Sequence, residues 1–166
     1  MNTFALKTLR LTAALASAVA LVTVAVLPAH AATPVAAQKT VAYKDNKALV
    51  TAYLQALFVE KDLATVEKFW GKDMIQHNPS MPNGLDVLRG ILGKIGPEFR
   101  YEQGLTMQQG NMVMVHGRYV GWGPKPMVAV DIFRIEAGKI VEHWDVMQEE
   151  VSADKSANGN AMFPAK

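Results

Sequence analysis

Two runs of alternating apolar and polar residues, 128–135 and 139–147, flank a short Gly-containing segment and constrain the fold more than any other feature. The alternation predicts the two β-strands of a hairpin, each with one face toward a core. That apolar face also carries Asp131, His143 and Asp145. A titratable group is costly to bury unless it has a partner. The hairpin therefore predicts a polar site inside an apolar cavity.

The length of the hairpin loop decides whether these three side chains meet. A two-residue loop, 137–138, would place Asp131 opposite Trp144 and put the two carboxylates on opposite faces of the sheet. A three-residue loop, 136–138, has glycine at its third position, where a type I turn followed by a G1 bulge needs a left-handed residue. That register places Asp131 opposite His143 and brings all three groups to one face. We predict the three-residue loop.

The first 31 residues have the pattern of a secretory signal peptide. Lys7 and Arg10 give a positive start, an almost wholly apolar run spans residues 11–27, and residues 29–31 match the small-x-small cleavage pattern. An uncleaved membrane anchor is the alternative, because the apolar run is only slightly shorter than a membrane span. Since the chain has no cysteine and no twin-arginine pair, we predict Sec-type export, cleavage near Ala31 and a periplasmic or secreted protein.

The rest of the chain reads as one domain between two short extensions. The two basic residues of the signal peptide account for the whole formal net charge of +2, and no Lys/Arg cluster remains that would indicate nucleic acid. We expect a flexible tether over 32–44, a single domain over 45–151 and a polar C-terminal tail over 152–166, in which Met162 and Phe163 are possible anchors. No membrane contact is expected after removal of the signal peptide.

Helical periodicity comes first in the domain, and strand alternation follows. Apolar residues three and four positions apart predict a helix from Asp45 or Asn46 to about Val59, and further helices after Asp62 and before Gly96. Strands are expected at 74–77 and at about 99–107, 112–122, 126–136 and 139–148. This order predicts an α+β fold: a cone of curved antiparallel sheet, covered by the N-terminal helices, with an apolar pocket at its mouth.

Several short segments spread over this domain match a known family. They are Asn46-Lys47, Lys61-Asp62, Ile75-Gln76-His77-Asn78-Pro79, Val115-His116, Asp131-Ile132-Phe133-Arg134, the stretch 138–146, and Ala157-Asn158 with Met162-Phe163. On these segments the chain resembles the SnoaL-like branch of the nuclear-transport-factor-2-like superfamily, and within it the bacterial predicted SnoaL-like aldol-condensation-catalysing enzymes. The resemblance implies an α+β cone, often dimeric, with a pocket between sheet and helices.

The resemblance also implies roles for two carboxylates. In SnoaL-type polyketide cyclases, an Asp on the last strand is the general acid/base of an intramolecular aldol closure, and Asp145 matches that position. In the related ketosteroid isomerases, an Asp in an Asp-x-Phe-Arg segment donates to an oxyanion, and Asp131 matches it. This chain differs from the antibiotic cyclases in two features. It has an Asp at position 131, where the cyclases have none, and it has an export signal, for which a polyketide cyclase has no obvious use. Fold does not fix substrate.

Each candidate residue also has a structural interpretation. Asp145 could be a strand-end carboxylate bonded to a loop. Asp131 could instead be a structural acid paired with Arg134 or His143. His143 is a candidate to tune Asp145 or to act as a base itself, and the alternative is a hydrogen-bonded core histidine.

The pocket wall offers further candidates for substrate binding. They are His77, His116, Tyr53 and Trp122. For His77, bracing of a loop is the alternative, and Trp144 is expected on the outer face of the sheet, in packing or in a dimer contact.

Two functions from different classes remain. The chain has no compact zinc-type spacing of ligands and no recognisable nucleophile motif, so we expect neither a metal nor a cofactor. One function is an exported enzyme in which Asp145 removes a proton next to a carbonyl and Asp131 or His77 stabilises the enolate, for aldol or isomerase chemistry on a small carbonyl compound. The other is a periplasmic binding protein for a small hydrophobic ligand. The resemblance implies a homodimer in either case.

Overall fold

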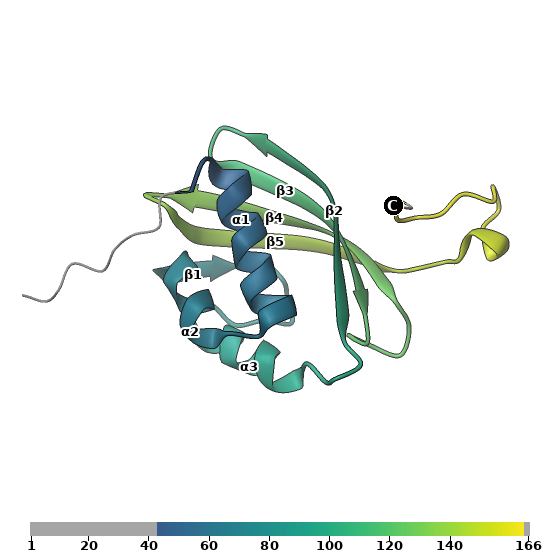
Figure 1. Ribbon diagram of the computed structural model, residues 1–166, viewed down its shortest axis with the longest axis horizontal. Helices are drawn as coiled ribbons and strands as arrows, with labels where there is room; N and C mark the ends of the chain where they lie inside the picture. Colours follow the sequence, from purple (N-terminus) through teal and green to yellow (C-terminus); the bar gives the residue numbers. More distant parts are fainter. Residues whose placement is uncertain (1–42, 165–166) are drawn as a thin grey trace, which may run out of the picture. The chain divides into compact units, whose positions relative to one another are not determined.

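The structure is a computed structural model that describes residues 43–164. The predicted signal peptide and all but the last two residues of the predicted tether lie outside the described residues. Among residues 43–164, no helix is both long and apolar enough to cross a membrane. A five-stranded curved sheet carries the helices on one of its faces (Figure 1).

The elements follow the order expected from the sequence. The helical part comprises α1 (Asn46–Leu54), which continues as the π-helix η1 (Gln55–Glu60), α2 (Leu63–Val66), the 3₁₀ turn η2 (Glu67–Phe69) and α3 (Asp86–Lys94). The strands are β1 (Trp70–Gln76), β2 (Arg100–Gln109), β3 (Met112–Val120), β4 (Met127–Glu136) and β5 (Lys139–Glu149), and the 3₁₀ turn η3 (Ala153–Lys155) follows.

Two aspartates begin the first helices, as predicted. The Asp45 carboxylate accepts a hydrogen bond from the backbone N–H of Ala48 at 2.9 Å, and the Asp62 carboxylate accepts one from Thr65 at 3.2 Å. Such caps satisfy N–H groups that have no partner within the helix. The first helical segment ends at Lys61, whose φ of 56° is left-handed.

The strand order is β1-β5-β4-β3-β2. Strands β2 to β5 are antiparallel neighbours, whereas β1 runs parallel to β5. The strand expected at 74–77 is longer than predicted, since β1 already begins at Trp70. The sheet is mixed rather than wholly antiparallel, because β1 is parallel to its neighbour. The α+β class, with helices against a curved sheet, is confirmed. The parallel pairing matters for the site because it places the end of β1 beside the middle of β5.

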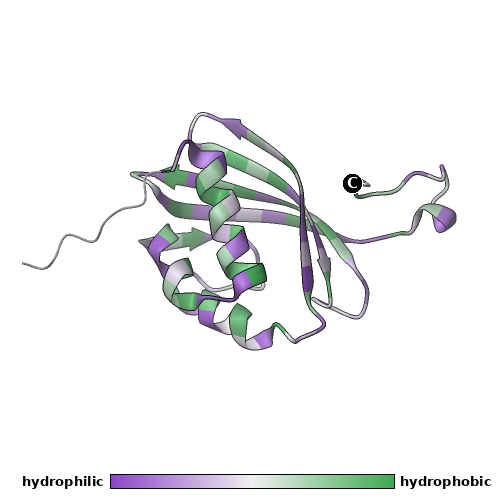
Figure 2. Ribbon diagram, in the orientation of Figure 1, coloured by the Kyte–Doolittle hydropathy of each residue, from purple (hydrophilic) through white to green (hydrophobic). Residues whose placement is uncertain are grey.

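The core lies between the helices and the inner face of the sheet. The predicted apolar stripe of α1 and η1 is buried throughout: Leu49, Val50, Tyr53, Leu54, Leu57 and Phe58. Apolar residues also recur along the central strands (Figure 2). Burial of each large apolar side chain contributes about 1.5–3 kcal/mol. These contacts hold α1 and η1 over the sheet and fix one wall of the cavity described below.

The loop of the β4–β5 hairpin differs from the prediction. It has two residues, Ala137 and Gly138, with φ of 49° and 72°, and Glu136 pairs with Lys139. Two left-handed residues in succession are typical of a type I′ turn, whose twist matches that of the flanking strands. Glycine adopts this conformation without strain, whereas alanine must be held in it by the strands. The three-residue loop is therefore wrong.

A bulge near the loop restores the face that the sequence predicted. Arg134 pairs with Glu142 but Ile135 pairs with Ile140, so Val141 is an extra residue in β5. One extra residue moves all later side chains of a strand to the other face. Beyond the bulge, Asp131 lies opposite Asp145, not opposite His143 as predicted.

The C-terminal tail is anchored by one of the two predicted residues. Phe163 is buried and its ring lies 5.1 Å from that of His116, on the face of β3 opposite the helices. The Met162 sulfur accepts a hydrogen bond from the backbone N–H of Val151. The tail thus packs against the outer side of the sheet, away from the cavity.

Candidate functional site

A small cavity lies between the helices and the inner face of the sheet. Its wall is mainly apolar and aromatic, with residues from α1, η1, α3 and the sheet. Tyr53 and Trp122, two of the candidate wall residues, are part of this lining. The polar and charged residues of the lining other than tyrosine and tryptophan are Gln76, Asp131, His143 and Asp145.

Asp131 is only 5% exposed and has two side-chain partners. The Tyr119 hydroxyl donates to its Oδ2 at 2.6 Å, and the Nε2 of His143 lies 3.3 Å from its Oδ1. Arg134, the alternative partner considered from the sequence, points to the other face and pairs with Glu142 and Glu136. Asp131 is therefore a buried acid that belongs to the cavity.

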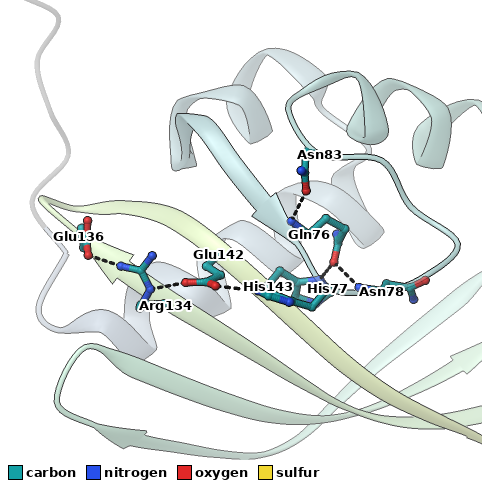
Figure 3. Close-up of polar contacts among 8 residues, drawn as sticks. All are labelled: Gln76, His77, Asn78, Asn83, Arg134, Glu136, Glu142 and His143. Carbon is teal, nitrogen blue, oxygen red and sulfur yellow. Dashed lines mark hydrogen bonds and ion pairs between the residues drawn. The ribbon is translucent and has the colours of Figure 1, made fainter.

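His143 is held from both sides of its ring. Its Nδ1 lies 2.8 Å from the Oε1 of Gln76, and that same oxygen accepts the backbone N–H of Asn78 at 3.1 Å (Figure 3). Gln76 and His143 are partners in the parallel β1–β5 pair, which places the two side chains together. The imidazole also lies against the ring of Phe133, with 4.8 Å between ring centroids. The orientation of the ring is thus fixed.

Asp145 is partly buried and is held by one amide. The Nδ2 of Asn78 lies 2.9 and 2.7 Å from its two carboxylate oxygens. The Oδ1 of Asn78 accepts the backbone N–H of Ser80 at 2.8 Å, so the amide presents its NH₂ group to the carboxylate. Both carboxylate oxygens of Asp145 are thus held in one orientation at the cavity.

Three tyrosines of the core, the buried Tyr53 and Tyr119 and the partly buried Tyr101, lie near Asp131. Burial, together with the negative charge of Asp131, raises the pKa of Tyr53, Tyr101 and Tyr119 above the ordinary value of 10. All three phenols are therefore neutral hydrogen-bond donors near neutral pH. Gly117 makes room for them, because a Cβ there would lie 2.9 Å from the ring of Tyr101. The Tyr101 hydroxyl is buried and has no hydrogen-bond partner among residues 43–164.

Two histidines predicted in the pocket lie elsewhere. His77 stacks on Trp144 with 4.5 Å between ring centroids, and its Nε2 lies 2.7 Å from Glu142 (Figure 3). His116 packs against Phe163 on the outer side of the sheet. Neither histidine is part of the cavity lining, so the expected placement of both in the pocket is not what the structure shows. His116 alternates with the buried Val115 and so faces outward, and His77 follows the last residue of β1.

Three residues of the site were not predicted from the sequence: Gln76, Asn78 and Tyr119. Gln76 and Asn78 lie 67 residues from the side chains they contact. No periodicity within β1 or β5 indicates that the two strands pair in parallel over that distance in the sequence. For Tyr119, alternation along β3 places it on the same face as Val115, which is the signal that could have indicated an inward hydroxyl.

The donor set also suits a divalent cation. One ligand atom each from Asp131, His143 and Asp145 lies within 4.8 Å of the others. Imidazole and carboxylate are ordinary ligands of first-row metal ions. The Tyr119 hydroxyl and the Asn78 amide already donate to the two carboxylates, so an ion bound here would share their oxygens with these hydrogen bonds.

A second, wider hollow of about 1,150 Å³, counted with its open mouth, adjoins the first. The two hollows share four lining residues, namely Met81, Ile91, Trp122 and Met147. Lys94 and Asp86 of α3 also line the second hollow. The charged groups of the inner cavity are thus approached through a mostly apolar outer chamber.

Comparison with known proteins gives a family match and a shared fold. The SnoaL-like domain model matches residues 50–143, more than half of the chain. No curated protein matches the chain. An NTF2-like protein of unknown function from Cytophaga hutchinsonii superposes with a TM-score of 0.56 at 17% identity, covering 66% of this chain and 94% of that one.

Two further solved structures share the fold. A "putative ketosteroid isomerase" from Kribbella flavida has a TM-score of 0.55 at 15% identity, covering 63% of this chain and 78% of that one. A "putative polyketide cyclase" from Bacillus cereus has a TM-score of 0.53 at 19% identity, covering 61% and 74%. At these identities the likeness extends to the fold alone.

Proposed function

The chain belongs to the SnoaL-like domain family, and we propose that it is an enzyme that removes a proton next to the carbonyl of a small, mainly apolar compound. The observation that carries this proposal is the juxtaposition of an oriented carboxylate, Asp145, with the buried Asp131–His143 pair in one apolar cavity. One carboxylate accepts a proton, and the neighbouring pair can donate one. Groups of opposite role in one cleft are the ordinary arrangement for acid–base catalysis.

The reaction begins when Asp145 takes the proton from the carbon next to the carbonyl. The electron pair of that C–H bond moves into the carbonyl and forms an enolate, whose oxygen accepts a hydrogen bond from the Asp131–His143 pair. In a compound with a C=C bond next to the ionised carbon, Asp145 returns the proton to the far carbon of the conjugated enolate, which is isomerisation. Otherwise the enolate carbon attacks a second carbonyl, and the new alkoxide takes the proton back from Asp145, which is aldol addition. Hydrogen bonds aimed at developing charge are strongest in a site from which water is excluded.

The environment suits these roles. Asp131 and His143 are at most 8% exposed, and the tyrosines beside them are neutral. Asp145 is less buried and lies nearer to solvent. A general base of this kind contributes about 10²–10⁴-fold to a rate. The apolar outer chamber would hold the body of the compound while its carbonyl reaches the inner cavity.

The reaction can be tested before the natural substrate is known. Purified protein is incubated in D₂O with a panel of apolar ketones and β-keto esters, and exchange of the C–H next to the carbonyl is followed by NMR. The wild type should accelerate exchange of at least one compound. Asp145→Asn should lower that rate by about 10²–10⁴-fold, whereas Asp154→Asn, at an exposed position in η3, should not change it.

The alternative is a binding protein for a small hydrophobic ligand. It would bind compounds of the panel without exchange above the buffer rate in the wild type, and that outcome would replace the enzyme by a carrier. Exchange that persists in Asp145→Asn would instead show that another group is the base.

We also propose that the protein is exported and forms a homodimer. The N-terminal pattern of residues 1–31 supports export. The outer face of the sheet supports the dimer, since Met114, Val130 and Val146 are exposed there and lie on neighbouring strands. Val130 pairs directly with Val146, and contiguous exposed apolar surface of this kind is typical of an interface.

A further inference from the structure

Gln76 has contacts that determine where the protons of the site lie. Its Oε1 lies between two partners, the backbone N–H of Asn78 at 3.1 Å and the Nδ1 of His143 at 2.8 Å (Figure 3). A backbone N–H can only donate, so the atom that faces it must be the oxygen of the amide. The Nε2 of Gln76 lies on the other side, 3.6 Å from the sulfur of Met81. The amide is therefore oriented by the main chain.

This orientation fixes one proton of the imidazole. The Oε1 of Gln76 has no proton to give, so the Nδ1 of His143 must be the donor. A neutral His143 then has a bare lone pair on Nε2. That atom lies 3.3 Å from the Oδ1 of Asp131.

Two acceptors cannot face each other at this distance in a buried site without a proton between them. The other oxygen of Asp131 already accepts the Tyr119 hydroxyl, which burial keeps neutral. The proton between Oδ1 and Nε2 must therefore belong to the pair itself, either on the carboxyl or on the imidazole.

We propose that Gln76 is a positioning residue that holds His143 with its proton on Nδ1, and so keeps one transferable proton between Asp131 and His143 beside Asp145. The pair is then neutral in total, and Asp145 is the negative group of the cavity. This division into one proton donor and one acceptor is what enolate chemistry requires, and in this sense the inference rests on the proposed function. The tautomer itself can be measured without any turnover.

The test uses the full chain labelled with ¹⁵N-histidine. Long-range ¹H–¹⁵N NMR spectra report which ring nitrogen carries a proton, and the signals of His143 are assigned by their loss in His143→Gln. In the wild type, Nδ1 of His143 should be protonated, whether or not Nε2 is protonated as well. A wild-type His143 protonated on Nε2 alone would overturn the proposal.

Variants at position 76 then separate the hydrogen bond from the fold. Gln76→Leu should lower the ratio of His143 protonated on Nδ1, alone or on both nitrogens, to His143 protonated on Nε2 alone by roughly two- to twelvefold, the weight of one ordinary hydrogen bond. Gln76→Glu keeps an oxygen at the same place and should retain Nδ1–H. Asn83→Ala is the matched control, because Asn83 accepts only the backbone N–H of Gln76. An unchanged ratio in Gln76→Leu would refute the role, and should that variant fail to fold, the wild type and Gln76→Glu still decide.

The exchange assay in D₂O separates a failure of the proposed function from a failure of the positioning role of Gln76. If the wild type exchanges no substrate proton but has the expected tautomer, the proposed function fails and the positioning role stands. If exchange depends on Asp145 but is equal in Gln76→Leu and wild type, the positioning role fails for catalysis. Where both hold, Gln76→Leu lowers kcat with little change in KM, and Gln76→Glu restores part of the rate.

Discussion

Tyr101 and Tyr119 allow a matched test of the electrostatics around Asp131. They are cross-strand partners on β2 and β3, with 5.0 Å between their ring centroids, and both hydroxyls are buried. They differ in one respect. The Tyr119 hydroxyl donates to Asp131 at 2.6 Å, whereas the Tyr101 hydroxyl has no hydrogen-bond partner in the part of the chain that the structure describes. The same substitution to phenylalanine should therefore destabilise the fold at position 119 and not at position 101.

The magnitudes follow from these contacts. Tyr119→Phe removes a hydrogen bond to a buried carboxylate and leaves one oxygen without a donor, so the free energy of unfolding should fall by about 1.5–3 kcal/mol. Tyr101→Phe removes a buried hydroxyl that is already unsatisfied, so the free energy of unfolding should stay unchanged or rise by about 1–2 kcal/mol. Neither change opens a cavity, because the ring remains.

Urea unfolding at pH 7, followed by circular dichroism, measures both effects. The slope with denaturant should be equal in the three proteins, so that a shift of the midpoint reports stability alone. Equal losses in the two variants would refute the reasoning, since they would mean that the hydroxyls contribute only through packing. A gain in Tyr119→Phe would mean that Asp131 is satisfied without it.

Three further outcomes are expected. The pKa of Tyr53, Tyr101 and Tyr119 is raised in the folded state, so the stability they contribute is complete below pH 10 and is lost as pH rises through the folded pKa, by up to about 1.4 kcal/mol per pH unit for each. The urea midpoint should therefore fall steeply from pH 9 to 11.5, and less steeply in Tyr119→Phe. A midpoint that does not change with pH would contradict this. If the outer face of the sheet forms the dimer interface, Val146→Lys should be a monomer in sedimentation velocity. Val59→Lys, at an exposed position of η1, should remain a dimer. A wild type that is monomeric at high concentration would exclude the dimer. Mass analysis of protein from the native host should find Ala32 at the N-terminus, and recovery of the membrane-bound precursor would favour an anchor.

The features predicted correctly from the sequence are those that local contacts determine. The caps at Asp45 and Asp62 act within three residues, and the apolar stripe of α1 repeats every three to four residues. The order of helices and strands follows from the same short-range periodicities. Because the spacing of apolar residues shows which side of a helix or of an alternating strand is buried, the α+β class could be predicted without tertiary information.

The features that were missed depend on pairings between distant segments. The parallel β1–β5 contact joins Gln76 to His143 and places Asn78 beside Asp145, and nothing in either segment alone specifies the partner. His116 was expected in the cavity, but it lies on the outer face of β3 together with Met112 and Met114. An apolar outer face makes alternation ambiguous about which side is the core.

The hairpin explains why a wrong loop still led to the right face for Asp131, His143 and Asp145. A strand residue has only two possible directions, so the face depends on whether the number of residues between two positions is odd or even. The type I′ loop is one residue shorter than predicted, and the bulge at Val141 supplies one extra residue. Together the two differences leave the side chains of β5 on the predicted face. They shift the pairing by two residues, so that Asp131 lies opposite Asp145 instead of His143. The bulge is therefore what allows a tight, strongly twisted turn to coexist with a carboxylate pair on the inner face, and deletion of Val141 should turn Asp145 outward and remove it from the cavity.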